Sequence, residues 1–260
     1  HAFGIIGSAM MPISDLFPQA GITFWDAAHE CNAGMMADGF TRATGKISMM
    51  VAQNGPGITN FVTPVKTAYW NHTPLLLVTP QAANKTLGQG GFQEVEQMAL
   101  FEDMVAYQEE VRDPSRIAET LNRVILQAKR ASAPAQINVP RDFWTQVIDI
   151  ELPAIVEFER PSGGEDAIAA ASEMLSNAEF PVMLNGAGVV IGGAIEASIK
   201  LAERLDAPVC CGYQHNDAFP GSHPLFAGPL GYNGSKAGME LIAKAAVSYT
   251  HLRAHETRPY

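Results

Sequence analysis

Short aliphatic runs alternate with helical patterns along most of this chain, and this alternation limits the possible folds more than any other feature. Strands buried on both faces are indicated by the runs HAFGII, ITFWDAA, ISMMVAQ, PLLLVTP and AQINVP. Helices are indicated between them, at 32–45, 58–70 and 114–131. Such alternation is typical of a parallel sheet covered by helices on both sides. We therefore predict an α/β protein whose first domain is a three-layer, parallel-sheet structure.

A loss of periodicity divides the chain into two parts. The first unit ends at INVPRDFW, and the stretch that follows contains more Pro and Gly. We interpret 1–150 as the first domain, 151–164 as an interdomain linker and 165–246 as a second, Rossmann-like α/β domain. Helices of the second domain are expected at 165–177 and 194–206, and strands in FPVMLNGAGV and APVCCGY. This domain is too short to complete a sheet, so we expect it to be truncated.

The end of the sequence differs in character from the rest. After GMELIAKAA the chain reads VSYTHLRAHETRPY, which clusters His, Arg, Thr and Tyr without an apolar period. An α/β domain needs a further aliphatic strand at this point, and we expect none here. A polar surface tail is one interpretation. The other, which we favour, is that 247–260 is a non-native segment resembling a translated cloning adaptor.

Composition and charge argue against several classes of partner. The formal net charge is −10 at pH 7, which disfavours nucleic acid or an anionic membrane surface as the main partner. No apolar run reaches the ~18 residues of a membrane span. The cysteines, Cys31, Cys210 and Cys211, are odd in number and favour a reducing compartment, so we expect the cytoplasm. The sequence begins at His1 without Met, and we expect the natural start of the first domain to be missing.

Glycine-rich turns follow three of the predicted strands. They are GIIGSAMMP at 4–12, NGPGITN at 54–60 and GQGGFQE at 88–94. In parallel α/β sheets such turns converge at the carboxyl ends of the strands, where ligands bind. Glycine lets backbone N–H groups approach a ligand closely. One such turn is weak evidence, but three of them together with the acid Glu30 predict a small-molecule site.

Glu30 lies between an apolar strand and a helix that is built mostly from small residues. A helix start usually has Ser, Thr, Asp or Asn at its cap and bulkier residues on its buried face. Here the small residues Ala33, Gly34, Ala37 and Gly39 are expected to leave room for something to approach closely. The alternative is a surface carboxylate that the helix dipole stabilises.

Taken in order, these motifs resemble a known family. The series FGIIG, a strand ending in His-Glu, GMMADGFTRATGK, NGPGITN and GGFQE resembles the pyrimidine-binding domain of thiamine-diphosphate enzymes related to acetolactate synthase. The resemblance covers 1–150, and the second unit is similar to the start of the central domain of those enzymes. Three longer runs, which begin at WNHTPLLL, APAQINVP and PVCCGYQH, resemble the branch that converts sulfoacetaldehyde and phosphate into acetyl phosphate and sulfite in taurine catabolism.

The resemblance implies thiamine diphosphate and Mg²⁺ as cofactors and assigns roles to several residues. Glu30 would hydrogen-bond the aminopyrimidine ring, because a carboxyl group in an apolar pocket can share a proton with a ring nitrogen. Gln93 matches a family glutamine near the reacting centre. The positions that match loops lying against the cofactor are Gly7, Ser8, Ala9, Asn54, Gly55, Pro56 and Gly57.

A sulfonate and a phosphate both need cations or hydrogen-bond donors. Our candidates for substrate contacts are His29, His72 and Lys85. Each also has an ordinary interpretation: a strand-end histidine, a loop donor and a solvated loop lysine. Gln93 could equally be a helix-start residue. Family members often carry Asp or another polar group where this chain has Gly90, which leaves the substrate contact at that position open.

The same resemblance implies a larger, oligomeric enzyme. Family members bind the diphosphate through a metal ion held by a GDG motif and a later Asn in a third domain, and GDG does not occur in this sequence. Their active sites lie between two subunits, so we expect a homodimer or homotetramer at full length and no catalysis by these 260 residues alone. NGAGVVIGG lacks dinucleotide-binding spacing, so we expect no nicotinamide cofactor.

Two alternatives to an enzyme that converts sulfoacetaldehyde and phosphate stay open at this point. A sister enzyme of the same fold would be a carboligase or decarboxylase that acts on pyruvate or another 2-keto acid. A protein of a different class would be a non-catalytic α/β module that only dimerises or binds a small ligand. A GDG motif in the full-length sequence would distinguish an enzyme from such a module.

Overall fold

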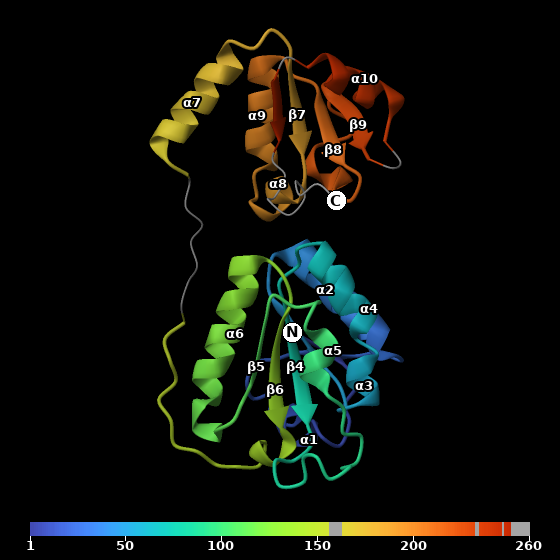
Figure 1. Cartoon of the computed structure of the whole chain (residues 1–260), viewed down its shortest axis with the longest axis vertical. Helices are drawn as coiled ribbons and strands as arrows, with labels where there is room; N and C mark the ends of the chain where they lie inside the picture. Colours follow the sequence, from blue (N-terminus) through green and yellow to red (C-terminus); the bar gives the residue numbers. More distant parts are fainter. Residues whose placement is uncertain (156–162, 232–233, 246, 251–260) are drawn as a thin grey trace. The chain divides into compact units, whose positions relative to one another are not determined.

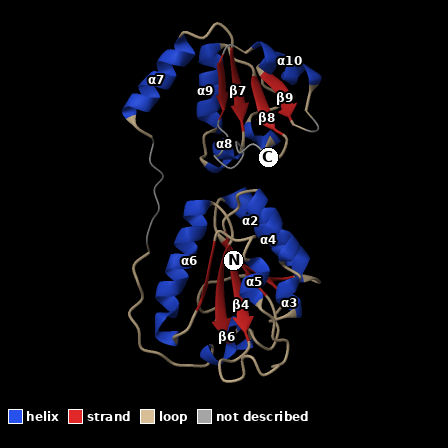
Figure 2. Ribbon diagram, viewed as in Figure 1, coloured by secondary structure: helices blue, strands red, loops and turns tan. Residues whose placement is uncertain are grey.

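The structure is a computed structural model that describes residues 1–155, 163–231, 234–245 and 247–250. Its contacts divide the chain into two compact units, His1–Glu159 and Arg160–Tyr260. Each unit contains a parallel sheet with helices packed against it (Figures 1 and 2). The predicted α/β class with parallel sheets is confirmed.

The first unit contains a six-stranded sheet in the order β2-β1-β3-β4-β6-β5. Its strands are β1 (Ala2–Gly4), β2 (Phe24–Asp26), β3 (Ser48–Val51), β4 (Leu75–Gln81), β5 (Tyr107–Glu110) and β6 (Ala135–Pro140). Alternate residues of β4 supply two different cores: Leu75 and Leu77 pack into one, and Leu76 and Val78 into the other. Side chains that alternate between two buried faces explain why every residue of this strand is buried.

Helices cover both faces of this sheet. One face carries α2 (Glu30–Thr44), α3 (Pro56–Thr59), α4 (Val62–Trp70) and α5 (Gln97–Phe101), and the other carries α1 (Met11–Ser14) and α6 (Ile117–Ala131). Short 3₁₀ helices lie at Pro114–Arg116 and Arg141–Phe143. The helix α2 ends at Gly45, whose φ of 70° is the left-handed conformation that glycine adopts without steric cost.

The strand β5 was not expected from the sequence. Its residues, YQEE, lack the aliphatic character of the other strands because β5 lies at the edge of the sheet and all four residues are partly exposed. It nevertheless pairs with β6 over its whole length, from Tyr107 opposite Ala135 to Glu110 opposite Asn138.

The second unit contains a four-stranded sheet in the order β10-β7-β8-β9. Its elements are α7 (Glu165–Ser176), β7 (Pro181–Asn185), α8 (Ala187–Ile191), α9 (Ile195–Leu205), β8 (Val209–Gly212), a 3₁₀ helix (Asn216–Ala218), β9 (Phe226–Leu230), α10 (Lys236–Lys244) and β10 (Val247–Thr250). The core of this unit includes Met183, Val209 and Phe219.

Two sequence-based expectations for this unit were wrong. The predicted strand FPVMLNGAGV ends at Asn185, and its GAGV portion turns into α8. The expectation that no strand follows α10 is also wrong, because β10 pairs in parallel with β7, with Val247 opposite Pro181. Backbone pairing needs no aliphatic side chains, which is why the composition of VSYT was misleading. Residues 156–162 of the proposed linker and 251–260 of the proposed tail lie outside the described residues.

Candidate functional site

The carboxyl ends of all the strands in the first unit lie at one edge of its sheet, because every pair of neighbours is parallel. The loops that follow β1, β2, β3 and β4 leave the sheet at this edge. These loops contain almost all of the site residues predicted from the sequence. Ligands of parallel α/β sheets bind at such an edge.

Glu30 is the first residue of α2, where the positive end of the helix dipole favours a carboxylate. His29 caps this helix, since its Nδ1 accepts a hydrogen bond from the Cys31 N–H at 3.1 Å. The Glu30 Oε2 atom accepts a hydrogen bond from Asn60 Nδ2 at 2.9 Å. No donor to the other oxygen, Oε1, occurs among the described residues, so this atom is available to a ligand.

Gly57 keeps the space beside Glu30 Oε1 open. A Cβ atom added at Gly57 would lie 3.2 Å from that oxygen and 3.4 Å from Gln53 Cβ. Gly57 is itself buried and belongs to the short helix α3. The missing side chain therefore leaves Glu30 facing the turn after β3 without a group in between.

The close approach predicted for the small residues of α2 is made by another part of this chain. A Cβ atom at Gly34 would lie 2.4 Å from Pro64 Cγ, and Ala33 and Ala37 are fully buried in the core. The space that these residues leave is filled by α4 of the same chain. Gly39 is exposed and has nothing within 4 Å of the place where a Cβ would lie. The predicted close approach therefore occurs at Gly34, and the group that approaches is Pro64 of the same chain.

Gln53 connects the loop after β1 to the turn after β3. Its Oε1 accepts a hydrogen bond from the Ala9 N–H at 2.9 Å and lies 3.5 Å from the Ser8 hydroxyl. A Cβ atom at Gly7 would lie 2.3 Å from the same oxygen, so only glycine allows this approach. Gln53 was not among the residues singled out from the sequence, although it directly precedes the NGPG motif.

Asn54 and Gln93 connect the turn after β3 to the loop after β4. Asn54 Nδ2 donates hydrogen bonds to the backbone carbonyls of Gln93 at 2.9 Å and Phe92 at 3.3 Å. Gly55 has a φ of 70°, and a Cβ there would lie 2.5 Å from the Gln93 carbonyl oxygen. Gln93 itself has a φ of 56°, which is uncommon for a residue with a side chain. Residues with side chains that adopt such a backbone conformation cluster at functional sites.

A network of buried hydrogen bonds connects this turn to the strands of the sheet. The Gly55 N–H donates to Gln97 Oε1 at 3.1 Å, and Gln97 Nε2 donates to the Pro80 carbonyl at 2.8 Å and to Asn138 Oδ1 at 3.2 Å. Asn138 Nδ2 donates to Glu110 Oε2 at 2.7 Å. Because Gln97 and Asn138 are fully buried, these bonds fix the position of the turn relative to β4 and β6.

The remaining predicted residues are placed less closely together. Pro56 begins α3 and is exposed, and Lys85 and Gly90 are exposed in the loop after β4. His72 precedes β4 and so lies at the amino end of that strand. A seven-residue strand spans about 23 Å, so His72 is at the opposite edge of the sheet from Glu30. The structure does not bring His72 into the cluster.

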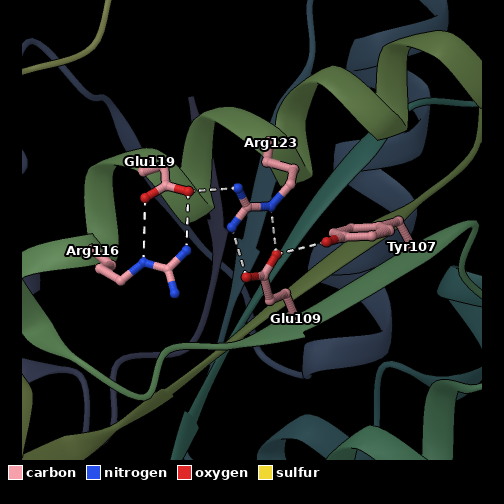
Figure 3. A network of polar contacts seen from close by, with 5 residues as sticks. All are labelled: Tyr107, Glu109, Arg116, Glu119 and Arg123. Carbon is pink, nitrogen blue, oxygen red and sulfur yellow. Dashed lines mark hydrogen bonds and ion pairs between the residues drawn. The ribbon is translucent and has the colours of Figure 1, made fainter.

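A second polar cluster lies where β5 meets α6 (Figure 3). Arg123 forms a bidentate pair with Glu109, at 2.7 and 2.8 Å, and also bonds Glu119 at 2.8 Å. Hydrogen bonds from Arg116 and Arg123 lower the pKa of Glu119 to about 2. The bond from Arg123 also lowers the pKa of Glu109, and the bond to Glu109 raises the pKa of Tyr107. Each carboxylate in this cluster is paired with an arginine, which indicates that the cluster links β5 to α6 structurally.

The second unit holds its reactive groups in its interior. Cys210 and Cys211 are fully buried in β8, and burial raises the pKa of Cys210 and raises that of Cys211 to about 12. Thiols with such pKa values are not nucleophilic at neutral pH. Among the described residues there is no group of three or more His, Cys, Asp or Glu side chains arranged to hold a metal ion. Within the residues that the structure describes, in both units, no helix has the length and apolar character required to span a membrane.

Comparison with protein families accounts for both units. Residues 1–100 match the N-terminal TPP binding domain of thiamine pyrophosphate enzymes, and residues 168–248 match the central domain of the same enzymes. The chain belongs to the thiamine pyrophosphate enzymes. Thiamine pyrophosphate is another name for thiamine diphosphate, so the family suggested by the sequence motifs is confirmed.

Several curated members of the thiamine pyrophosphate enzymes are similar to this chain. A sulfoacetaldehyde acetyltransferase from Roseovarius nubinhibens is 82% identical over 95% of the chain, and one from Rhodobacter capsulatus is 72% identical over the same share. An acetolactate synthase from Arthrospira platensis is 32% identical over 90% of the chain. The chain spans only 41–42% of the length of these relatives.

Solved structures of thiamine pyrophosphate enzymes have the same fold. A thiamine diphosphate-dependent 4-hydroxybenzoylformate decarboxylase from Rhodococcus jostii superposes with a TM-score of 0.80 at 27% identity, covering 88% of this chain and 44% of that one. A benzoylformate decarboxylase from Polynucleobacter necessarius gives 0.84 at 22% identity, covering 96% and 47%. At 22% identity the second comparison concerns the fold alone.

Proposed function

We propose that the full-length protein is a thiamine-diphosphate-dependent acetyltransferase that converts sulfoacetaldehyde and phosphate into acetyl phosphate and sulfite. The observation that carries this proposal is the difference in identity between two groups of relatives. Sulfoacetaldehyde acetyltransferases are 48–82% identical over 94–95% of the chain, whereas acetolactate synthases are 31–33% identical over 90–94%. Because both groups match most of the chain, the higher identity of the first group favours an acetyltransferase over a carboligase.

The residues around Glu30 fit a thiamine diphosphate ring. Glu30 Oε1 has no donor among the described residues, and Gly57 leaves the adjacent space without a side chain. Bound thiamine diphosphate would supply the carbon nucleophile and electron sink that acyl transfer from an aldehyde requires. Glu30 would hold a proton at Oε1 against a ring nitrogen, while Asn60 fixes the carboxylate through Oε2.

The other predicted residues would surround this ring. The backbone of Gly7, Ser8 and Ala9 would line one side, and the turn formed by Asn54, Gly55, Pro56 and Gly57 would lie beneath it. Gln93 would face the reacting centre, and His29 and Lys85 are the remaining candidates for substrate contacts. We propose that Mg²⁺ is held by the part of the full-length protein that this chain does not span.

The domain boundaries and assembly are also proposals. We propose a pyrimidine-binding domain at 1–150, a linker at 151–164 and a central domain that begins at 165 and includes β10 instead of ending at 246. Family resemblance supports a homodimer or homotetramer in which a second subunit completes each site. The three cysteines are free, which supports a reducing compartment, and we propose the cytoplasm.

The direct test uses the full-length protein with thiamine diphosphate and Mg²⁺. We expect it to release sulfite from sulfoacetaldehyde only when phosphate is present, with acetyl phosphate formed in equal amount. Consumption of pyruvate without sulfite release would show a carboligase or decarboxylase of the same fold. Failure to turn over either substrate, or to bind the cofactor, would favour a non-catalytic module.

A further inference from the structure

The hydrogen bonds of Gln53 determine which way the Gln93 side-chain amide faces. Gln53 Oε1 accepts from the Ala9 N–H at 2.9 Å, and a backbone N–H can only donate. The Gln53 atom beside Ala9 is therefore oxygen, and its Nε2 must face the other way. That nitrogen lies 2.7 Å from Asn54 Oδ1 and 2.8 Å from Gln93 Oε1, so both of its hydrogens are used.

A second backbone group fixes the same polarity independently. Asn54 Nδ2 donates to the carbonyls of Phe92 and Gln93, which can only accept. The Asn54 atom that faces Gln53 is therefore Oδ1, in agreement with a donor at Gln53 Nε2. The Gln93 atom that meets this donor must also be an acceptor, since two N–H groups would repel each other.

The outcome is that the Gln93 amide holds its oxygen toward Gln53 and presents its N–H donors to a ligand. Its Oε1 is occupied by Gln53, and its Nε2 has no acceptor among the described residues. Gln93 is partly buried and held at a φ of 56°, so its side chain starts from a fixed position. A fixed donor at this place suits an oxygen that carries negative charge.

We propose that Gln53 is a positioning residue that fixes Gln93 as a hydrogen-bond donor to an oxyanion of the reactants. The shared chemistry is that of a sulfonate or a phosphate oxygen. This inference rests on the proposed function for the identity of the oxyanion, while the polarity of Gln93 follows from the contacts above. In this proposal Gln53 acts on the oxyanion through Gln93, to which it donates a hydrogen bond.

The test is a double-mutant cycle in the full-length protein loaded with thiamine diphosphate and Mg²⁺. Calorimetric titrations with ethanesulfonate, an unreactive sulfonate, and with inorganic phosphate are made separately on the wild type, Gln53→Met, Gln93→Met and the double variant. We expect each single variant to weaken the binding of one of these anions by about tenfold, the usual effect of losing a hydrogen bond to a charged group. The anion that is affected identifies the source of the oxyanion.

The double variant gives the decisive comparison. If the effect of Gln53 on the anion passes through Gln93, the double variant should bind the anion no more weakly than Gln93→Met, although Gln53 also bonds Ala9 and Asn54. A merely structural role of Gln53 would instead give losses that multiply, and that result would overturn the proposal. Unchanged anion affinity in Gln53→Met, or no binding of either anion by the wild type, would overturn it as well.

Gln53→Glu reverses the polarity without removing the acceptor for the Ala9 N–H. Its second oxygen would face both Asn54 Oδ1 and Gln93 Oε1. Asn54 is held by its bonds to two backbone carbonyls, so the Gln93 amide should be the one that turns and presents oxygen to the ligand. We expect a greater loss of anion affinity than in Gln53→Met. The control Gln19→Glu adds the same charge at an exposed position away from the site and should leave affinity unchanged. An affinity in Gln53→Glu equal to that of the wild type would contradict the proposal, even if Gln53→Met fails to fold.

The proposed function and this inference fail in distinguishable ways. Sulfite release by the wild type without coupling between Gln53 and Gln93 would overturn the positioning role and leave the acetyltransferase in place. Coupling in anion binding without sulfite release would overturn the acetyltransferase and leave the positioning role in place for a different anionic substrate.

Discussion

At the scale of single residues, the glycines at 55 and 57 serve different physical purposes although they lie in one turn. Gly55 has a left-handed backbone and approaches the Gln93 carbonyl, so its absent side chain is required by the fold. Gly57 has an ordinary helical backbone, and its absent side chain leaves room beside Glu30 Oε1. Alanine at each position should therefore affect a different property.

Gly57→Ala should weaken cofactor binding and cost less stability than Gly55→Ala, although its Cβ would also lie 3.1 Å from Ala52 Cβ. Its Cβ would lie 3.2 Å from Glu30 Oε1 and obstruct the approach of a ring nitrogen. We expect the dissociation constant for thiamine diphosphate in the full-length protein to rise by about tenfold or more, as for a lost hydrogen bond to a charged group. Calorimetric titration measures this change, and wild-type affinity would contradict the placement of the ring beside Gly57.

Gly55→Ala should instead destabilise the first unit. A left-handed residue with a side chain costs about 1–3 kcal/mol, and here the added Cβ would also collide with the Gln93 carbonyl at 2.5 Å. Urea unfolding should show a lower free energy of unfolding than Gly57→Ala does. Equal stability of the two variants would contradict the distinction between them.

The candidate site could be predicted from sequence only where a residue belongs to a motif. Glu30 and the NGPG turn were found because their local pattern is visible in the chain. Gln53 was missed because its partners, Ala9 and Gln93, are 44 and 40 residues away, and no local pattern encodes such contacts. The group that approaches Gly34 could not be named from sequence for the same reason, since it belongs to Pro64.

At the scale of elements, the close contact between α2 and α4 depends on Gly34. A Cβ at this position would lie 2.4 Å from Pro64 Cγ, so Gly34→Ala should force the helices apart. We expect a loss of about 1–3 kcal/mol in the free energy of unfolding, the usual cost of overpacking. Gly39→Ala is the matched control in the same helix, because nothing lies near it, and it should be neutral or slightly stabilising. Equal unfolding free energies for the two variants would contradict this packing.

The link between β5 and α6 should make stability depend on pH in the acid range. The folded-state pKa of Glu119 is about 2, against an ordinary value of 4.5, and that of Glu109 is also lowered. A lowered pKa gives stabilisation that is fully present above the ordinary value and is lost as pH falls through the folded value. The network should therefore stabilise the protein above about pH 4.5 and lose its effect toward pH 2.

Arg123→Met tests this dependence. At pH 7 we expect the variant to be less stable by about 1 kcal/mol, as for a partly exposed bidentate pair. The difference from the wild type should shrink as the pH is lowered below 4.5, because the partners of Arg123 become protonated. Lys129→Met, which removes a charge from the same helix without breaking the network in Figure 3, should not show this convergence.

Elements with a buried apolar pattern were predictable, and elements without one were not. Helices α6 and α9 match the helices predicted from apolar periodicity, and strands β4 and β6 match the predicted aliphatic runs. The strand β5 was missed because an edge strand can be polar, and β10 was missed because its pairing with β7 depends on the backbone. The pattern of apolar residues indicates which segments are buried. It does not indicate which polar segments pair as strands at the edge of a sheet.

At the scale of the whole molecule, the chain consists of two units with separate cores, and the two matched domains fall one in each unit. The residues proposed to bind the cofactor all come from the first unit. Since the chain spans about 41% of its relatives, the activity belongs to the proposed full-length enzyme.

The measurement that tests this mechanism most directly is phosphate-dependent sulfite release by full-length Glu30→Gln. An amide cannot hold the proton that Glu30 is proposed to share with the cofactor ring, so we expect release to fall by about 10²–10⁴-fold. Glu102→Gln, an equivalent change at an exposed position, should retain wild-type release. Wild-type sulfite release by Glu30→Gln would contradict the role assigned to this carboxylate and the site built around it.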